Sequence, residues 1–203
     1  MSRSRREKAV PDDPRDPSAL RPVLLLLVGA SGSGKTTFYE THLKTVFPKV
    51  LKASASPLEQ EETDQERKRL LNAGESFVYQ SVAFDLPLIR EATSVGYEVK
   101  AVYVATEDPT LNLGRVLIRV SNGGPFAPIS RIPQDYTHGV KQLPEVKKMA
   151  DDLMLFDNTP HGRGVRLIAH FRERKLVKLA RTIPKWAQEA FGREFNEWLN
   201  PSS

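Results

Sequence analysis

The chain of 203 residues predicts an α/β fold with a mostly parallel central sheet and helices on both faces. Three observations support this class. Residues 23–28 form a continuous aliphatic run, which is typical of a central parallel strand buried on both faces. A glycine-rich segment at 29–36 follows that run directly and leads into a helix-compatible segment. Beyond it, strand and helix patterns alternate along the chain, which indicates a sheet wound with helices.

The first half of this alternation has clear boundary signals. Asp85 and Asp108 suit helix N-caps, Pro109 suits a first helical turn, and Gly74 and Gly96 suit the residues that follow a helix. We therefore expect strands over 23–28, 49–52, 77–80 and 97–104, and helices over 36–46, 57–73, 85–94 and 108–120.

The second half begins with a long loop. Residues 121–133 contain two glycines and three prolines, and this length favours a lid over a simple connection. Two strands and a helix are expected after it, over 153–156, 166–171 and 184–199, with a turn at 157–160 between the strands. The final helix places four aromatic side chains near helical spacing, which favours core packing over a ligand site: Trp186, Phe191, Phe195 and Trp198.

The predicted domain organisation has three parts. Residues 1–21 form a basic, proline-rich tail that we expect to be disordered. Residues 22–172 form the α/β domain, and residues 173–203 form a C-terminal helical extension packed on it. The chain has the length of one domain with short extensions.

The segment 29–36 carries the most specific signal in the chain. It reads Gly-Ala-Ser-Gly-Ser-Gly-Lys-Thr, the G-x-x-x-x-G-K-[ST] pattern of a phosphate-binding loop, or P-loop, and it lies between a strand and a helix as that pattern requires. Its backbone N–H groups and the following helix N-terminus cradle phosphate oxygens. The sequence therefore predicts a P-loop NTPase three-layer sandwich that binds ATP or GTP.

Each position of this loop has an expected role. Lys35 pairs with β- and γ-phosphate oxygens, and the Thr36 hydroxyl ligates Mg²⁺. The predicted nucleotide-binding residues are Gly29, Ala30, Ser31, Gly32, Ser33, Gly34, Lys35, Thr36 and Thr37.

Composition excludes several classes of protein. The chain has no cysteine and only four histidines, so it has no disulfide and no thiolate zinc site. Its apolar run at 23–28 is far shorter than a membrane span, and its basic start lacks the apolar region of a secretory signal. The net charge of +5 lies mainly at the two ends, which favours solvated termini over a nucleic-acid site. We expect a cytoplasmic protein, where nucleotide is available.

Further motifs resemble those of the zeta-toxin group of P-loop kinases, over about residues 22–172. They are Gly-Glu-Ser-Phe-Val-Tyr at 74–79, Val-Gly-Tyr at 95–97, the arginines 115 and 119, Gly-Gly at 123–124 and Phe-Asp-Asn at 156–158. The resemblance implies a Mg²⁺-dependent kinase that phosphorylates a small-molecule hydroxyl, as zeta toxins phosphorylate the 3′-hydroxyl of UDP-N-acetylglucosamine. It also implies an antitoxin-like protein partner.

The same resemblance implies two catalytic arginines beside Lys35. Arg119 matches a charge-stabilising arginine of the lid, and Arg131 is the best candidate for the second, although the family places basic residues immediately before the tyrosine at 136. Their guanidinium groups would neutralise the transferring phosphoryl group. Arg115 and Arg119 lie four residues apart on one predicted helix, so one of them is expected at the surface.

The chain departs from the family at two carboxylates. Family members have an Asn-Ala-Asp element whose aspartate accepts the substrate proton, but this chain has Lys-Ala-Ser at 52–54. Family members also have a strand that ends in Phe-Glu-Thr-Thr, but this chain has Tyr-Gln-Ser-Val at 79–82, so a glutamine replaces the glutamate. Asp85 and Asp108 are first explained as helix caps, and the glutamates 59, 61 and 62 as a solvated helix face. The general base is therefore left unidentified.

The sequence is compatible with three functions. The first is a kinase acting on a small-molecule hydroxyl, with Lys35, Thr36, Arg119 and Arg131 as its working residues. The second is a catalytically impaired nucleotide-binding module, a pseudo-kinase that acts through a protein partner. The third, favoured only by the basic ends, acts on nucleic-acid ends.

Overall fold

The computed structural model describes residues 21–125, 127–159 and 164–200. The expected tail at 1–21 lies, apart from Arg21, outside the described residues. The strands are β1 (Val23–Val28), β2 (Val50–Lys52), β3 (Phe77–Ser81), β4 (Glu98–Ala105), β5 (Asp152–Asp157), β6 (Arg166–Arg172) and β7 (Lys175–Leu179). The helices are α1 (Lys35–Phe38), η1 (Tyr39–Leu43), α2 (Pro57–Asn72), α3 (Leu86–Ser94), α4 (Pro109–Ser121), η2 (Ile129–Arg131), α5 (Ile132–Met149) and α6 (Lys185–Leu199).

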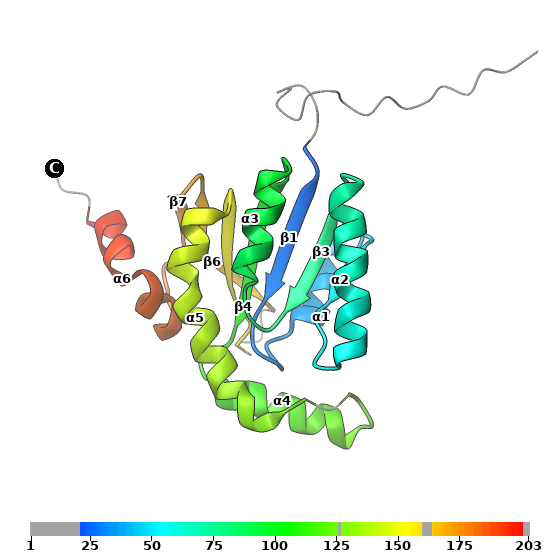
Figure 1. The fold of residues 1–203 in the computed structure, drawn as a ribbon. Helices are drawn as coiled ribbons and strands as arrows, with labels where there is room; N and C mark the ends of the chain where they lie inside the picture. The colour runs from blue at the N-terminus through cyan, green and yellow to red at the C-terminus, as the bar shows by residue number, and fades with distance from the viewer. Residues whose placement is uncertain (1–20, 126, 160–163, 201–203) are drawn as a thin grey trace, which may run out of the picture.

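One sheet runs through the molecule in the order β2-β3-β1-β4-β5-β6-β7 (Figure 1). Its first five strands are parallel, and β6 and β7 continue it antiparallel. The strand β1 is central, because Val28 lies opposite Ser81 of β3 and Tyr103 of β4. The carboxyl ends of β1, β3 and β4 therefore meet at one edge of the sheet, where ligands of open α/β folds bind.

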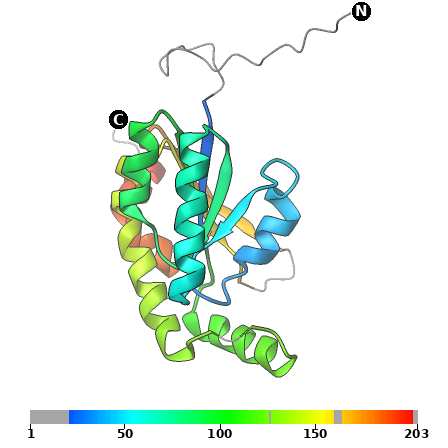
Figure 2. The same cartoon turned by 45° about the vertical axis from the view of Figure 1, so that its right-hand side comes forward.

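Helices cover both faces of the sheet, which confirms the predicted α/β class. On one face, Leu24 and Leu26 pack in a large core with side chains of α2, α3, α5 and α6. On the other face, Leu25 and Leu27 pack with Phe38 and Tyr39 of α1 and η1. The helix α4 lies across the carboxyl edge of the strands in both views (Figures 1 and 2). The site is thus framed by the sheet edge and by α4.

The predicted helix caps are confirmed. The Asp85 carboxylate accepts a hydrogen bond from the Leu88 N–H at 2.9 Å, and the Asp108 carboxylate accepts one from the Thr110 N–H at 2.7 Å. Such bonds satisfy N–H groups that the first helical turn leaves unpaired. They fix where α3 and α4 begin, at the edge that carries the site.

The helix expected over 36–46 is shorter and irregular. The α-helical turns end at Phe38, and the π-helix η1 continues to Leu43, with the Lys44 N–H bonded to the Tyr39 carbonyl at 3.0 Å. This wider turn places two consecutive aromatic residues, Phe38 and Tyr39, in the same buried cluster.

The loop expected over 121–133 is also shorter than predicted. The 3₁₀ turn η2 occupies Ile129–Arg131, and the helix α5 begins at Ile132 and extends to Met149. Pro133 lies in the first turn of α5, where a proline needs no N–H partner. The helix α5 was not expected from the sequence.

The C-terminal extension differs from its prediction in one element and agrees in another. Residues Lys175–Leu179 form the strand β7 within the segment expected to be helical. In α6, the residues Trp186, Phe191 and Phe195 are buried in the core as expected, whereas Trp198 is 47% exposed. Within the described part of the chain, no helix has both the length and the apolar character needed to cross a membrane.

Candidate functional site

The phosphate-binding loop lies between β1 and α1 at the carboxyl edge of the sheet. The Ser33 N–H donates to the Ala30 carbonyl at 3.1 Å, and Gly34, with φ of 101°, forms the N-cap of α1. Backbone N–H groups in such a turn at a helix start form an anion-binding concavity.

Residues of α4 and the residue that follows β5 also contact the phosphate-binding loop and hold it in place. A Cβ atom at Gly32 would lie 2.3 Å from the Asn112 carbonyl oxygen of α4, so the two backbones touch here. The Asn158 side chain donates to the Ser33 carbonyl at 2.8 Å. Arg115 donates to the Asn158 carbonyl at 2.8 Å and to the Gly32 carbonyl at 3.4 Å. Arg115 is thus a positioning residue for the loop, and the motif at 156–158 packs against the loop through Asn158.

The Lys35 side chain is folded back over this loop. Its ammonium group donates to the Gly29 carbonyl at 2.5 Å and to the Ala30 carbonyl at 3.1 Å, and the residue is only 8% exposed. Burial, and to a smaller extent the Arg119 charge, lower the pKa of Lys35 to about 8, while the Asp135 carboxylate acts in the opposite direction. The charges of Arg119 and Asp135 therefore both influence the Lys35 ammonium group.

Burial of the Lys35 cation leads to a prediction about the free energy of unfolding. Since the pKa of Lys35 is lowered on folding, its protonated form opposes folding at every pH below about 8, and this penalty declines as the pH rises from 8 toward 10.5. A shift of this size corresponds to about 3 kcal/mol, offset in part by two hydrogen bonds. We expect Lys35→Met to raise the free energy of unfolding by about 1–3 kcal/mol at pH 7, with a smaller difference near pH 10.

Urea unfolding across that pH range measures this effect. The matched control is Lys68→Met, at an exposed lysine of α2, which should change little at either pH. A Lys35→Met protein that is less stable than the wild type at pH 7 would contradict the buried-charge account.

The two candidate arginines differ in their surroundings. Both are exposed, but the Arg119 charge lowers the pKa of Lys35, whereas Arg131, whose side chain is 68% exposed, pairs with Asp135 at 3.8 Å. Asp135 is a site residue that sequence reasoning missed. It precedes Tyr136, where the family has basic residues, and its side chain is 17% exposed and charge-coupled to Lys35. An acidic residue at a position expected to be basic was its only sequence signal.

Thr36 has the surroundings expected of a Mg²⁺ ligand. The Gln80 amide nitrogen donates to the Thr36 hydroxyl at 3.3 Å, and the Gln80 amide oxygen is buried with no partner among the described residues. Mg²⁺ prefers oxygen ligands and keeps several waters, so a threonine hydroxyl and an unpaired amide oxygen suit it. Among the described side chains, no group of three or more His, Asp or Glu residues is arranged to hold a metal ion.

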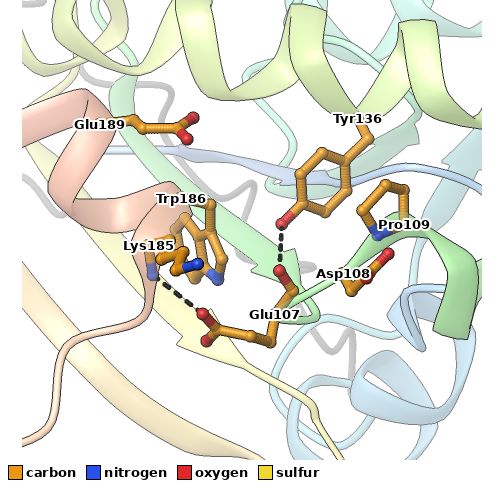
Figure 3. Close-up of a pocket in the computed structure, with 7 residues that line it drawn as sticks. All are labelled: Glu107, Asp108, Pro109, Tyr136, Lys185, Trp186 and Glu189. Atoms are coloured by element: carbon orange, nitrogen blue, oxygen red, sulfur yellow. Dashed lines mark hydrogen bonds between the residues drawn. The ribbon is translucent and has the colours of Figure 1, made fainter.

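A cavity of about 310 Å³ lies beside this site, at the carboxyl end of β4 (Figure 3). The Tyr136 hydroxyl donates to the Thr106 carbonyl at 2.7 Å, and the Glu107 carboxylate accepts from the Lys185 N–H at 3.1 Å. The Trp186 indole N–H is buried and unpaired among the described residues. The cavity is lined by Glu107, Asp108, Pro109, Tyr136, Lys185, Trp186 and Glu189. Three carboxylates disfavour a phosphate here, so the cavity suits an uncharged or cationic group.

Comparisons with known proteins define the class of the fold. No family model matches the sequence, and no curated protein matches it either. Among solved structures, the AvrRxo1-ORF1:AvrRxo1-ORF2 complex matches with a TM-score of 0.60 and 17% identity over 77% of this chain and 60% of that one. The same complex has also been solved with ATP, with a TM-score of 0.57 and 15% identity. The chain thus spans about 60% of the AvrRxo1 chain that it matches.

Two further structures match over most of their own length. One is from the PezAT toxin–antitoxin system of Streptococcus pneumoniae, with a TM-score of 0.53 and 18% identity over 87% of this chain and 80% of that one. The other is a candidate kinase from Chloroflexus aurantiacus, with a TM-score of 0.54 and 16% identity over 71% and 92%. The chain therefore has a P-loop kinase fold. At the level of fold, these neighbours confirm the resemblance to the zeta-toxin-like group.

Proposed function

We propose that this protein is a P-loop phosphotransferase that moves the γ-phosphoryl group of ATP or GTP to a hydroxyl group of a small molecule. The observation that carries the proposal is the intact phosphate-binding loop at the sheet edge, with the Lys35 ammonium group held over it by the Gly29 and Ala30 carbonyls. Phosphoryl transfer depends mainly on positioning and charge neutralisation, which these groups supply.

The residues divide this work between them. The N–H groups of residues 29–37 bind phosphate oxygens, and Lys35 exchanges its two carbonyl partners for β- and γ-phosphate oxygens. Arg119 neutralises charge that spreads over the transferring group. Thr36 and Gln80 would hold Mg²⁺, which supplies further charge neutralisation when bound. Arg131 joins this set if the segment 121–131 moves toward the nucleotide.

The acceptor and the partner follow from the resemblance and the fold neighbours. A nucleotide sugar such as UDP-N-acetylglucosamine is the first acceptor to test. The PezAT neighbour is part of a toxin–antitoxin system, which supports an antitoxin-like protein partner here. A cytoplasmic location follows from the need for nucleotide.

The second candidate function is a pseudo-kinase that binds nucleotide and acts through a protein partner. The observation that favours it is the neutral amide of Gln80 next to Thr36, at a position where the family has a carboxylate. It predicts nucleotide binding without turnover.

Thermal unfolding in the presence of nucleotide, followed by a search for phosphorylated product, tests both candidate functions. A ligand at 100 times its Kd stabilises a protein by about 2.7 kcal/mol, so Mg·ATP or Mg·GTP should raise the melting temperature of the wild type but not of Lys35→Ala. A panel of nucleotide sugars and polyols is then incubated with the preferred nucleotide, and phosphorylated product is sought by mass spectrometry. Binding without any product would favour the pseudo-kinase, and absence of any nucleotide effect would contradict both functions.

A further inference from the structure

The residue at the end of the Lys-Ala-Ser element is bonded to a carboxylate. The Ser54 hydroxyl donates to the Glu59 carboxylate at 2.5 Å, across the start of α2. Glu59 was expected to belong to a solvated helix face; it is exposed, but it has this specific partner. A short O–H···O⁻ bond is strong, and it polarises the hydroxyl toward giving up its proton.

This pair lies on the phosphate side of the sheet edge. The Ala53 N–H, next to Ser54, donates to the Gln80 carbonyl at 2.9 Å. The Gln80 side chain in turn donates to the Thr36 hydroxyl at 3.3 Å. A continuous series of contacts therefore runs from the expected metal ligand to Ser54.

The Ser54 hydroxyl is held in an orientation that leaves one lone pair available. A hydroxyl has one donor and two acceptor positions. The donor is bonded to Glu59, and one lone pair accepts the Ser56 N–H at 3.0 Å. The Ser54 N–H donates to the Gln60 side-chain oxygen at 2.9 Å, which fixes the backbone. The remaining lone pair could accept the hydrogen of an acceptor hydroxyl.

Two other carboxylates of this region, those of Asp85 and Asp64, are paired with Arg67. Asp85 accepts the Leu88 N–H with one oxygen and pairs with Arg67 through the other at 3.1 Å. Asp64 accepts the Gln60 amide at 2.9 Å and pairs with Arg67 at 3.3 Å. Glu59 differs from both because it accepts a hydrogen bond from a hydroxyl, through which a proton can pass.

We propose that Ser54 and Glu59 form a two-residue proton relay that serves as the general base of this phosphotransferase, an inference that rests on the proposed function. As the acceptor oxygen forms its bond to the γ-phosphorus, the bond from that phosphorus to the β,γ-bridging oxygen breaks and the nucleoside diphosphate leaves. The acceptor proton passes to the Ser54 oxygen, the Ser54 proton passes to Glu59, and Glu59 later releases it to water.

The experiment uses water as the acceptor, so that no substrate need be known. Release of inorganic phosphate from Mg·ATP is measured for the wild type, Glu59→Gln, Ser54→Ala and the control Glu61→Gln, an exposed glutamate on the same helix. We expect Glu59→Gln and Ser54→Ala to lower turnover about 10²-fold, the usual contribution of a general base, and Glu61→Gln to leave it unchanged. Nucleotide-induced stabilisation should be the same in all four proteins.

A rescue variant separates this role from helix capping. Ser54→Asp in the Glu59→Gln background places a carboxylate at the position of the Ser54 hydroxyl. We expect the turnover of this double variant to be about tenfold higher than that of Glu59→Gln alone. Turnover of Glu59→Gln equal to that of the wild type, or failure of Ser54→Asp to rescue, would overturn the relay. If Mg·ATP still stabilises the wild type and not Lys35→Ala in that case, nucleotide binding stands and only the relay fails.

Discussion

Replacement of Arg119 by alanine is expected to lower phosphoryl transfer about a thousandfold, because a guanidinium group that neutralises the transferring phosphoryl contributes 10³ or more to the rate. Arg119 is exposed on α4, yet its charge lowers the pKa of Lys35. Its charge therefore acts on the lysine that we propose to bind the phosphates. Nucleotide affinity should change much less than turnover, since this charge is needed most in the transition state.

Single-turnover phosphate release and nucleotide titration measure the two quantities separately. Arg90→Ala, at an exposed arginine of α3, is the matched control and should leave both unchanged. Arg131→Ala tests the second candidate, which pairs with Asp135 in this structure; we expect a loss of about tenfold or less. Equal losses for Arg131→Ala and Arg119→Ala would show that the lid arginines act together.

Gly32→Ala is expected to remove nucleotide binding and to destabilise the fold. Gly32 has φ of 81°, which an L side chain adopts with strain, and the added Cβ would lie 2.3 Å from a backbone oxygen of α4. The strain and the forced backbone shift together should cost about 3 kcal/mol or more. The shift would also move α4, which carries Arg115 and Arg119, away from the loop.

Gly114→Ala provides the matched control on the same helix. Nothing lies within 4 Å of a Cβ atom built at Gly114, which is inside α4. Alanine there should be neutral or should stabilise by about 0.5–1 kcal/mol. Urea unfolding of both variants measures the difference, and an unchanged midpoint for Gly32→Ala would contradict the close contact between the loop and α4.

The sequence predicted the elements whose signals are local. The phosphate-binding loop, the strand β1 and the caps Asp85 and Asp108 each depend on a few neighbouring residues, and the structure places them as expected. The start of α5 was missed because Pro133, read as a loop residue, is also suited to a first helical turn. The strand β7 was missed because its residues, Lys-Leu-Val-Lys-Leu, lack regular alternation.

The site residues that were missed depend on contacts distant in sequence. The coupling of Asp135 to Lys35 arises only because the tertiary fold brings the first turn of α5 near the loop. The bond from Asn158 to Ser33 likewise joins the residue after β5 to the loop after β1, which lies two strands away in the sheet. Sequence patterns give residue types and periodicity, but they give no distance between such groups.

The packing around α4 has a consequence for how the molecule opens. Val116, Ala127 and Ile132 form a small buried cluster that is separate from the two clusters on the sheet faces. A segment held by so few apolar contacts unfolds locally with a lower free energy than the sheet does. Backbone amides of α4 should therefore exchange their hydrogens with solvent well before those of β1. Because Arg119 belongs to this segment, local opening would displace the arginine to which we assign charge neutralisation while leaving the sheet and the strand β1 in place.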